Sequence, residues 1–427
     1  MNDLSADGKV AVGSSSSIGP AVVWTDHDGT VVISDTGDGS PFEERHSVAQ
    51  AVSADGKVIA GASELNAFAA APHDTVASLG NSIQINQSLG MLATPQAGVY
   101  HYTETTGISG DGTVVVGYSD SDSGFQAFRW TAATGMVGLG DLPGGGYDSR
   151  IFGITEDGSV LVGAATSAEG WQAVVWTEGH GFSGLGDFPG GAFLSDARGV
   201  SNDGNVVVGI GSGVEGREAF RWTAGSGLTG LGDLPGGEHY SFAAAVSGDG
   251  SVIVGDSSSE RTGALGSEAI IWDIARGMRP LTDVLLHDYG LDVPQLLERP
   301  YLSNGVDISR DGKVILGGDW LADLRDEPAP GDTNFDGRVD LADFGTLKAN
   351  FGSGKYRDQG DFTADGRVDL SDFGILKANF GAAQVAAPEP ASEGLALLAL
   401  LIGVLAKTLG PRSSRRATPR AHHRVTP

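Results

Sequence analysis

The sequence of 427 residues contains no cysteine, which excludes a disulfide framework and thiolate metal sites. Basic residues are also scarce, because 27 lysines and arginines stand against 54 aspartates and glutamates. The net charge of -27 would repel a polyanion, so nucleic acid is disfavoured as a partner. The apolar run 394–406 is too short for a stable membrane span, since a helix needs about 20 residues to cross a bilayer.

Glycine, in contrast, is abundant. There are 67 glycines, and only 19% of the residues are charged, a composition typical of short strands joined by many turns. A chain of this length with 40% hydrophobic residues can bury more than one core. The composition therefore predicts a mainly β protein with additional parts.

A nine-residue pattern of the form Ser-Ala-Asp-Gly-Lys-Val-Ala-Val-Gly recurs along the first 320 residues. Its copies occupy 5–13, 53–61, 109–117, 155–163, 201–209, 247–255 and 309–317. The final glycines of the central copies are 46 residues apart, as Gly163 and Gly209 are. An aromatic stretch follows each central copy, with Trp130, Trp176 and Trp222 at the same phase. Such internal self-similarity indicates a repeat architecture.

Each repeat predicts four short strands. The clearest set is 197–201, 205–210, 218–223 and 228–234. Four strands in about 46 residues is the length of one propeller blade, and a ring of blades leaves no exposed edge at its ends. We predict a seven-unit β-propeller over 1–325, with a last unit of two strands that stops near Trp320. Six units plus a partial one, or an open β-solenoid, are the alternatives.

The repeat, with its Asp-Gly turn, its Ala-Phe-Arg-Trp strand and its Leu-Gly-Asp-Leu-Pro-Gly-Gly segment, resembles the bacterial extracellular HAF repeat family. The resemblance implies an extracellular location and this architecture. The segment 281–293 also looks like the terminal region of such repeats. We interpret the turn aspartates and the repeated tryptophans as parts of the fold, because Asp before Gly favours tight turns and one Trp per blade favours core packing.

Repetition fails in the second unit, which lacks its tryptophan. An insertion from Asn81 to Glu104 follows there and contains Tyr100, His101 and Tyr102. If the propeller has a binding surface of its own, this segment is the first candidate, with a polysaccharide as a candidate ligand. A surface loop without a ligand is the alternative.

Two later segments, 332–343 and 361–372, have the spacing of calcium-binding loops. In such loops positions 1, 3, 5, 7, 9 and 12 supply oxygen ligands, and a glycine at position 6 turns the chain. The first loop offers Asp332, Asn334, Asp336, the Arg338 carbonyl, Asp340 (directly or through water) and Asp343. The second offers Asp361, Thr363, Asp365, the Arg367 carbonyl, Asp369 and Asp372. We expect two Ca²⁺ ions, with the weaker site in the second loop because Thr363 is neutral.

A helix is predicted after each loop, and no helix is expected before the first one because Pro328 and Pro330 precede it. One helical face would carry Leu341, Phe344, Leu347 and Phe351, and its copy would carry Leu370, Phe373, Leu376 and Phe380. Paired units of this form, over 332–381 after a proline-rich linker at 326–331, resemble the type I dockerin. The resemblance implies a cohesin-type partner contacted by loop positions 10 and 11, which are Leu341, Ala342, Leu370 and Ser371.

The C-terminal region begins with a linker, 382–394, that contains Pro388, Glu389 and Pro390. A hydrophobic helix and a basic tail follow over 395–427. This order resembles the PEP-CTERM sorting signal, which implies an exosortase-type processing enzyme as a partner and a transient association with the membrane. The basic tail would stay on the cytoplasmic side. A weak transmembrane anchor is the alternative.

Residues 1–30 contain no signal peptide, although a sorting signal acts on exported chains. We expect the signal peptide upstream of Met1, which already lies inside a repeat. The upstream segment could also supply strands that close the ring. The predicted location is therefore the cell surface or the extracellular space.

These features predict an exported, non-catalytic protein that binds calcium and docks to a cohesin-type partner. The alternative is a secreted propeller glycosidase or polysaccharide lyase. A glycosidase needs two carboxylates on either side of one bond, yet the acidic residues that break the repeat, such as Glu104, Glu156 and Glu215, pick out no pair. No serine-hydrolase, phosphate-loop or His-Glu-x-x-His motif is present.

Overall fold

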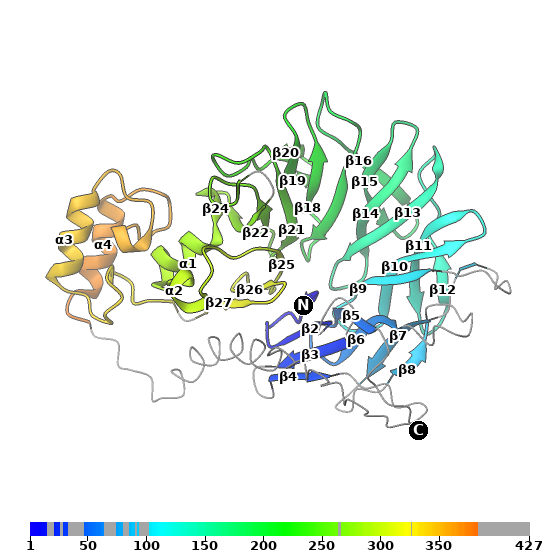
Figure 1. Cartoon of the computed structure of the whole chain (residues 1–427), viewed down its shortest axis with the longest axis horizontal. Helices are drawn as coiled ribbons and strands as arrows, with labels where there is room; N and C mark the ends of the chain where they lie inside the picture. The colour runs from blue at the N-terminus through cyan, green and yellow to red at the C-terminus, as the bar shows by residue number, and fades with distance from the viewer. Residues whose placement is uncertain are drawn as a thin grey trace, which may run out of the picture. The chain divides into compact units, whose positions relative to one another are not determined.

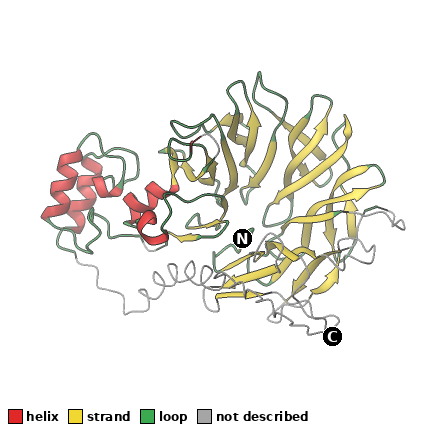
Figure 2. Ribbon diagram, viewed as in Figure 1, coloured by secondary structure: helices red, strands yellow, loops and turns green. Residues whose placement is uncertain are grey.

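The computed structural model describes residues 1–14, 21–25, 29–32, 47–63, 74–79, 85–89, 92–93, 102–263, 266–325 and 327–382. In this part the chain is mainly β, and its helices follow residue 280 (Figure 2). The predicted sorting motif, hydrophobic helix and basic tail lie outside the described residues, as does most of the 81–104 insertion. Among the described helices, none is long and apolar enough to cross a membrane.

In the described residues the strands form seven antiparallel groups that follow one another along the chain (Figure 1), and the strands of each group pair in chain order. We call these groups sheets 1 to 7, although sheets 3 and 4 are joined into one eight-stranded sheet. Sheet 1 contains β1 (Asp3–Leu4), β2 (Val10–Ser14), β3 (Ala21–Thr25) and β4 (Gly29–Val32). Sheet 2 contains β5 (Ser47–Val52), β6 (Val58–Ser63), β7 (Asp74–Leu79) and β8 (Ile85–Ser88). Sheet 3 contains β9 (Thr103–Ile108), β10 (Val114–Ser121), β11 (Gly124–Thr131) and β12 (Gly135–Gly138).

The later sheets repeat this plan. Sheet 4 contains β13 (Gly144–Ile154), β14 (Val160–Ser167), β15 (Trp171–Thr177) and β16 (Gly181–Gly186). Sheet 5 contains β17 (Asp196–Val200), β18 (Val207–Ser212), β19 (Arg217–Thr223) and β20 (Gly227–Gly230). Sheet 6 contains β21 (Ser241–Val246), β22 (Val252–Ser257), β23 (Glu268–Asp273) and β24 (Gly277–Pro280), and sheet 7 contains β25 (Gly305–Ile308), β26 (Val314–Gly317) and β27 (Leu321–Asp323). One parallel pair, Phe125 with Asp148, joins sheets 3 and 4.

The Asp-Gly turn between the first two strands is built by local hydrogen bonds, as sheet 5 illustrates. Asp203 accepts from the Ser201 hydroxyl at 2.6 Å and from the Asn205 amide at 3.0 Å. The Val206 amide donates to the Ser201 hydroxyl oxygen at 3.0 Å. Gly204 adopts φ +70°, a left-handed conformation that favours glycine. The turn aspartates therefore have the structural role that the sequence predicted.

The same glycine also brings neighbouring sheets into contact. A Cβ on Gly204 would lie 2.9 Å from Cγ2 of Val160 in the preceding sheet, so glycine is needed for space as well as for its φ angle. Every sheet repeats this contact, including the first, whose turn glycine meets a valine of the last sheet. The pairs are Gly8 with Val314, Gly56 with Val10, Gly112 with Val58, Gly158 with Val114, Gly204 with Val160, Gly250 with Val206 and Gly312 with Val252.

The sheets close into a ring. Each first strand contacts the first strand of the next sheet, and β25 contacts β1. Backbone hydrogen bonds join the residues just before the turn aspartates: Ala6 N to Ala54 O, Ala54 N to Gly110 O, Gly110 N to Glu156 O, Asn202 N to Gly248 O, Gly248 N to Arg310 O and Arg310 N to Ala6 O. This closed arrangement of radial sheets is propeller-like and does not match an open solenoid.

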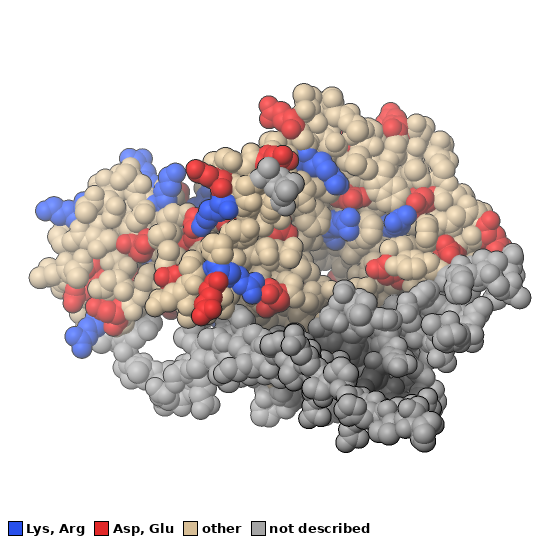
Figure 3. All heavy atoms as spheres, in the orientation of Figure 1, with Lys and Arg blue, Asp and Glu red and all other residues tan. Residues whose placement is uncertain are grey.

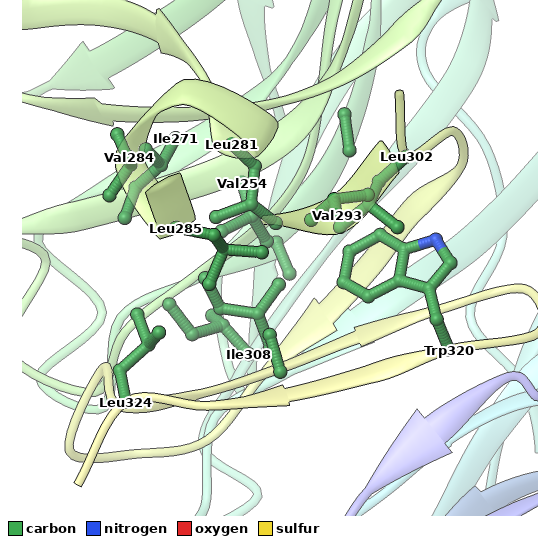
Figure 4. Close-up of a cluster of buried hydrophobic side chains, with 14 residues drawn as sticks. Val254, Ile271, Leu281, Val284, Leu285, Val293, Leu302, Ile308, Trp320 and Leu324 are labelled. Carbon is green, nitrogen blue, oxygen red and sulfur yellow. The ribbon is translucent and has the colours of Figure 1, made fainter. Parts of the chain in front are cut away.

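The last sheet differs from its prediction, because β27 gives it three strands and not two. Two helices that the sequence analysis did not anticipate, α1 (Leu281–Tyr289) and α2 (Val293–Leu297), lie between sheets 6 and 7 in the chain. Their apolar side chains fill one core cluster together with both sheets (Figure 4). Leu281, Val284 and Leu285 of α1 meet Trp320 and Ile308 of the last sheet in this cluster.

The repeated tryptophans are only in part core residues. Trp130 is 7% exposed and packs with Phe128 and Val115. Trp176 and Trp222 are half-buried and lie at the edges of their clusters. The prediction of one buried Trp per unit is therefore correct for Trp130 and too strong for Trp176.

Residues 327–382 form a small helical module with the helices α3 (Leu341–Asn350) and α4 (Leu370–Asn379). The short 3₁₀ helix η3 (Arg357–Gln359) precedes the second loop. The core of the module contains Val339, Leu347, Val368 and Leu376. Phe344 and Phe373 pack against it, with ring centroids 5.9 Å apart.

Candidate metal and docking site

The two loops fold by the same local rules. The Gly337 amide donates to Asp332 Oδ2 at 2.8 Å, and the Gly366 amide donates to Asp361 Oδ2 at 2.8 Å. These bonds turn each loop back onto its first carboxylate. Gly337 and Gly366 have φ angles of +79° and +81°, so glycine is the favoured residue at position 6. Position 4 is also left-handed in both loops, where Phe335 and Ala364 tolerate φ near +57° and +58°.

The aspartates at position 12 lie in the first turn of the helices. Asp343 Oδ1 accepts from the Thr333 amide at 2.8 Å, and its Oδ2 accepts from the Asp340 amide at 2.8 Å. Asp340 in turn accepts from the Ala342 amide, which completes a capping box at the start of α3. Asp369 and Asp372 repeat this arrangement at α4. Asp343 and Asp372 are fully buried, so each loop holds a carboxylate away from water.

The first loop leaves one of its carboxylate oxygens without a partner. Asp332 is 1% exposed, and its Oδ1 is buried without a hydrogen bond. Burial is the main cause that raises the pKa of Asp332, and the charges of Asp343 and Asp336 add to this shift. A buried, unpaired carboxylate oxygen beside other carboxylates is unfavourable unless a cation compensates it. The donor set, with oxygen atoms alone, suits Ca²⁺.

The second loop satisfies its carboxylate more fully. Asp361 Oδ1 accepts from the Asp365 amide at 3.2 Å and from the Thr363 hydroxyl at 3.4 Å. Burial again raises the pKa of Asp361, with a further contribution from the charges of Asp372 and Asp365. The two loops therefore differ in how their first carboxylate is bonded, because the Thr363 hydroxyl donates to Asp361. The weaker calcium affinity expected for the second loop stays a prediction.

The predicted ligands lie around two loop interiors, but their carboxylates do not converge. Among the residues that the structure describes, no three acidic or histidine side chains form a cluster that could hold a metal ion. The physical reason is that Asp343 and Asp372 direct both oxygens to backbone amides. Asn334, Asp336 and Asp340 are exposed at the rim of the first loop. The complete ligand sets and the number of ions therefore stay predictions. The spacing of the loops predicted which residue types would be ligands. It did not predict that the residue at position 12 also takes part in the capping box of the following helix.

The two halves of the module are joined by backbone pairing at loop position 8. The Gly352 amide donates to the Val368 carbonyl at 2.8 Å, and the Gly381 amide donates to the Val339 carbonyl at 2.8 Å. These bonds are equivalent under the 29-residue repeat of the loops. Each loop is thus tied to the end of the other half's helix, and Val339 and Val368 are buried beside each other's helices.

The predicted helix faces are only half buried. Leu347 and Leu376 are in the core, whereas Leu341 and Leu370 are each 74% exposed. Phe351 and Phe380 are 51% and 50% exposed, so only part of each predicted apolar face is buried. The reason is that position 10 lies in the first helical turn, outside the packing of α3 on α4. The four predicted contact residues Leu341, Ala342, Leu370 and Ser371 are all exposed.

Comparison with protein families finds one match. Residues 330–381 match the model of the dockerin type I domain. Domains of this type bind calcium and cohesin partners, and they indicate an extracellular or cell-surface protein. The match covers the module and does not reach the ring. No curated protein matches the chain.

Among solved structures, the chain is similar to TolB from Acinetobacter baumannii, with 12% identity and a TM-score of 0.42 over 63% of this chain and 61% of that chain. It is also similar to hydrazine synthase from Kuenenia stuttgartiensis, with 13% identity and a TM-score of 0.40 over 75% of this chain and 91% of that chain. The chain thus spans less than two thirds of the length of that TolB. These similarities carry no argument about activity.

Proposed function

We propose that the protein is an exported, non-catalytic component of the cell surface or extracellular space. In this proposal the module binds two calcium ions and docks to a cohesin-type partner. Docking of the module then attaches the propeller-like ring to that partner. The observation that carries the proposal is the pair of exposed leucines, Leu341 and Leu370, at equivalent positions in a segment that matches the dockerin type I domain.

The surface chemistry supports docking at these residues. Leu341 and Leu370 expose more of their area than almost any other large apolar side chain among the described residues. Each follows the aspartate that caps its helix, Asp340 or Asp369, so loop and contact residue form one rigid unit. A calcium ion that orders the loop would therefore also fix the orientation of the leucine. This coupling gives a physical reason for calcium-dependent docking.

The placement of one pair of carboxyl groups in the ring supports the non-catalytic assignment. Asp3 and Asp307 come from the first and last sheets, and the Leu4 amide donates to both, at 2.9 Å each. The two carboxyl groups also hydrogen-bond to each other, and burial raises the pKa of both. They are thus closer than the separation of about 5 to 10 Å that a glycosidase needs between its two carboxylates. Such a pair can share one proton where the first and last sheets meet.

Other elements of the proposal concern export and processing. The HAF-like repeat favours an extracellular location, and the Pro388-Glu389-Pro390 motif favours recognition by an exosortase-type enzyme during transient membrane association.

On the face shown in Figure 3, basic side chains of the described residues are interspersed with acidic ones. This distribution supports the proposal that nucleic acid is not a partner.

The test measures binding of the full chain to cohesin domains encoded in the same genome, with 1 mM calcium or with excess chelator. Leu341→Asp combined with Leu370→Asp should weaken binding at least about tenfold, because buried apolar anchors dominate interfaces. Val214→Asp is the matched control, since Val214 is an apolar residue of the ring that is 78% exposed. Binding that resists both the chelator and the double variant would contradict the proposal.

The enzyme alternative has its own test. The purified chain is incubated with plant and marine polysaccharides, and the release of reducing ends and the absorbance of unsaturated sugars are measured. We expect no turnover. Turnover that a single acidic substitution abolishes would overturn the non-catalytic assignment.

A further inference from the structure

A pocket of about 260 Å³ lies inside the ring and is lined by residues from all seven first strands and their turns. Its volume is close to the lower end of the range for small-molecule sites, which is about 300 Å³. The pocket therefore suits a ligand of the size of one small ring. None of the predicted site residues of the module lines it.

An arginine spans one end of the pocket. Arg310, next to the last sheet, forms an ion pair with Glu156 of the turn in sheet 4. The Asn202 carboxamide, turned so that its oxygen faces Arg310, accepts from the same guanidinium at 2.9 Å. Sheets 7 and 4 are not neighbours in the ring, so a side chain that joins them must cross its middle. The opposite end, near Asn2 and Gln50, is consequently the mouth.

A chain of polar contacts begins at the mouth, with Asn2 and Gln50, and continues across the first three sheets. Asn2 Nδ2 donates to Gln50 Oε1 at 3.4 Å, and Gln50 Nε2 donates to Glu104 Oε1 at 3.3 Å. Glu104 also accepts from the hydroxyls of Tyr102 and Tyr118. Burial, together with the bond to Glu104, raises the pKa of Tyr102 to about 12 and that of Tyr118 further. Both hydroxyls therefore remain donors, and Glu104 is held in one orientation.

The contacts continue over sheets 4 to 6 as stacked rings and guanidinium groups. Arg150 lies 5.1 Å from the Tyr118 ring centre and 5.4 Å from that of Trp171. Arg198 lies 4.1 Å from the ring centre of Phe152 and 5.7 Å from that of Phe242. Such cation–π contacts fix both partners without burying them. We call the whole arc, from Asn2 to Phe242, the mouth network.

The internal repeat supplies an independent observation. The Ser or Thr, Asp and Gly of the turn are alike in all seven units, because they build the sheets. The position three residues before that Ser or Thr lines the mouth, and it is occupied by a different residue in each unit. In order of the sheets these residues are Asn2, Gln50, Thr106, Phe152, Arg198, Ala244 and Val306. A position that only built the sheets would not need seven side chains of such different chemistry.

The order of these residues gives the mouth one polar side and one apolar side. Amides and a hydroxyl occupy sheets 1 to 3, an aromatic ring and a guanidinium occupy sheets 4 and 5, and small apolar residues occupy sheets 6 and 7. The guanidinium groups are already paired, Arg150 with Asp148 at 2.9 Å and Arg198 with Asp196 at 3.2 Å. An anionic ligand would therefore find no unpaired arginine there.

We propose that the mouth of this pocket binds an uncharged polyhydroxylated ring, either a free neutral sugar or the end of a neutral glycan chain. The hydroxyl groups of such a ring match the hydrogen-bonding capacity that these side chains keep. Thr106 Oγ1 donates to the Ile151 carbonyl at 2.6 Å and can still accept, the Asn2 oxygen can accept, and the Gln50 carboxamide keeps a second N–H and a second lone pair. Its C–H faces match Phe152 and the apolar residues of sheets 6 and 7. This binding belongs to the ring alone and does not depend on docking by the module.

The experiment is a calorimetric titration of the full chain with cellohexaose, xylohexaose and mannohexaose, with their three monosaccharides, and with trigalacturonate as the anionic probe. We expect binding of at least one neutral hexasaccharide at a stoichiometry of one. An equal affinity for its monosaccharide would assign the site to a free sugar. A higher affinity for the hexasaccharide would assign it to the end of a glycan.

Gln50→Leu and Arg198→Met should each weaken this binding about three- to tenfold, the effect of one lost hydrogen bond or stacking contact. Arg221→Met is the matched control, because Arg221 lies on β19 and does not line the pocket. If Arg198→Met fails to fold, Gln50→Leu decides alone. The proposal is overturned if no neutral hexasaccharide binds, if folded variants bind as the unaltered chain does, or if trigalacturonate binds more tightly.

Discussion

The ring and the module both contain aspartates that accept hydrogen bonds at tight turns, but the surroundings of Asp203 in the ring and of Asp332 in the module are opposite. In the ring Asp203 is exposed, and the Ser201 hydroxyl, followed by the Asn205 amide, lowers its pKa. In the module Asp332 is buried beside other carboxylates, and burial raises its pKa. The difference teaches that an aspartate at a tight turn does not by itself define a metal site. What matters is whether hydrogen bonds from the protein reach both carboxylate oxygens or leave one oxygen for a cation.

The comparison extends from the residues to the stability of each region. The ring closes on itself and holds several buried clusters between its sheets, so its stability comes from packing. The module holds one cluster of four buried residues and eight loop aspartates, four in each loop. Such a small core seldom suffices alone, and a bound ion can supply the missing free energy.

The largest expected effect is the loss of the module's order without calcium. Hydrogen exchange of the full chain should show protected amides in α3 and α4 with calcium and little protection with chelator, while the ring stays unchanged. Asp332→Ala should abolish most of the calcium response, because the loop loses its buried carboxylate. Thr363→Ala should have a smaller effect.

Asp203→Ala is the control for the metal loop, since it removes a hydrogen-bonded turn aspartate from the ring. It should leave the calcium response of α3 and α4 intact. Equal protection of the module with and without calcium would contradict the claim that the module, unlike the ring, depends on calcium for its order.

A second prediction concerns packing in the ring. Trp130→Ala should lower the free energy of unfolding by about 3 to 5 kcal/mol, because the indole is buried against Phe128 and Val115. Trp176→Ala should cost less, since Trp176 is half-buried. Urea unfolding followed by fluorescence measures both, at saturating calcium. If the two variants are equally unstable, the distinction between core and edge tryptophans is wrong.

The smallest effect is a pH dependence inside the ring. Asp256 is 8% exposed, and burial raises its pKa to about 6. A raised pKa in the folded state contributes stability at low pH, which is lost as the pH rises from about 4 through about 6. Asp256→Asn should remove this loss, so its free energy of unfolding relative to the unaltered chain should rise by roughly 1 to 3 kcal/mol between pH 4 and pH 7.

For Asp203→Asn, the free energy of unfolding relative to the unaltered chain should fall as the pH rises. The reason is that the lowered pKa of Asp203 contributes stability that is lost as the pH falls. Unfolding free energies at four pH values between 4 and 7 compare the three proteins. Parallel pH curves for the Asp256→Asn variant and the unaltered chain would contradict the burial argument.

Local patterns were sufficient to predict the elements that depend on neighbours in sequence. The four strands expected in the unit around Asp203 were found as β17 to β20, with the last strand shorter than expected. The start of each helix after its loop was also predicted correctly, because Asp340 and Asp369 cap the helices within a few residues.

Features that depend on distant contacts were not predictable in this way. The helices α1 and α2 gain their stability from sheets 6 and 7, which no local pattern reveals. The exposure of Leu341 follows from how α3 packs on α4, which the helical period alone does not specify. The mouth network was missed because its residues are far apart in sequence. The signal that could have found it is the repeat position where the units disagree.

The seam between the last and first sheets has a consequence for the time course of folding. Neighbouring sheets elsewhere are joined by contacts between residues close in sequence, but the seam joins Leu4 to Asp307, 303 residues apart, and Asp7 to Arg325, 318 residues apart. Contacts of such long range form late, because the intervening chain must first be ordered. During synthesis the early sheets can stack as they emerge, while sheet 1 keeps one side uncovered until sheet 7 arrives. Sheet 1 is thus the region most exposed to mispairing with another copy of the chain before folding is complete.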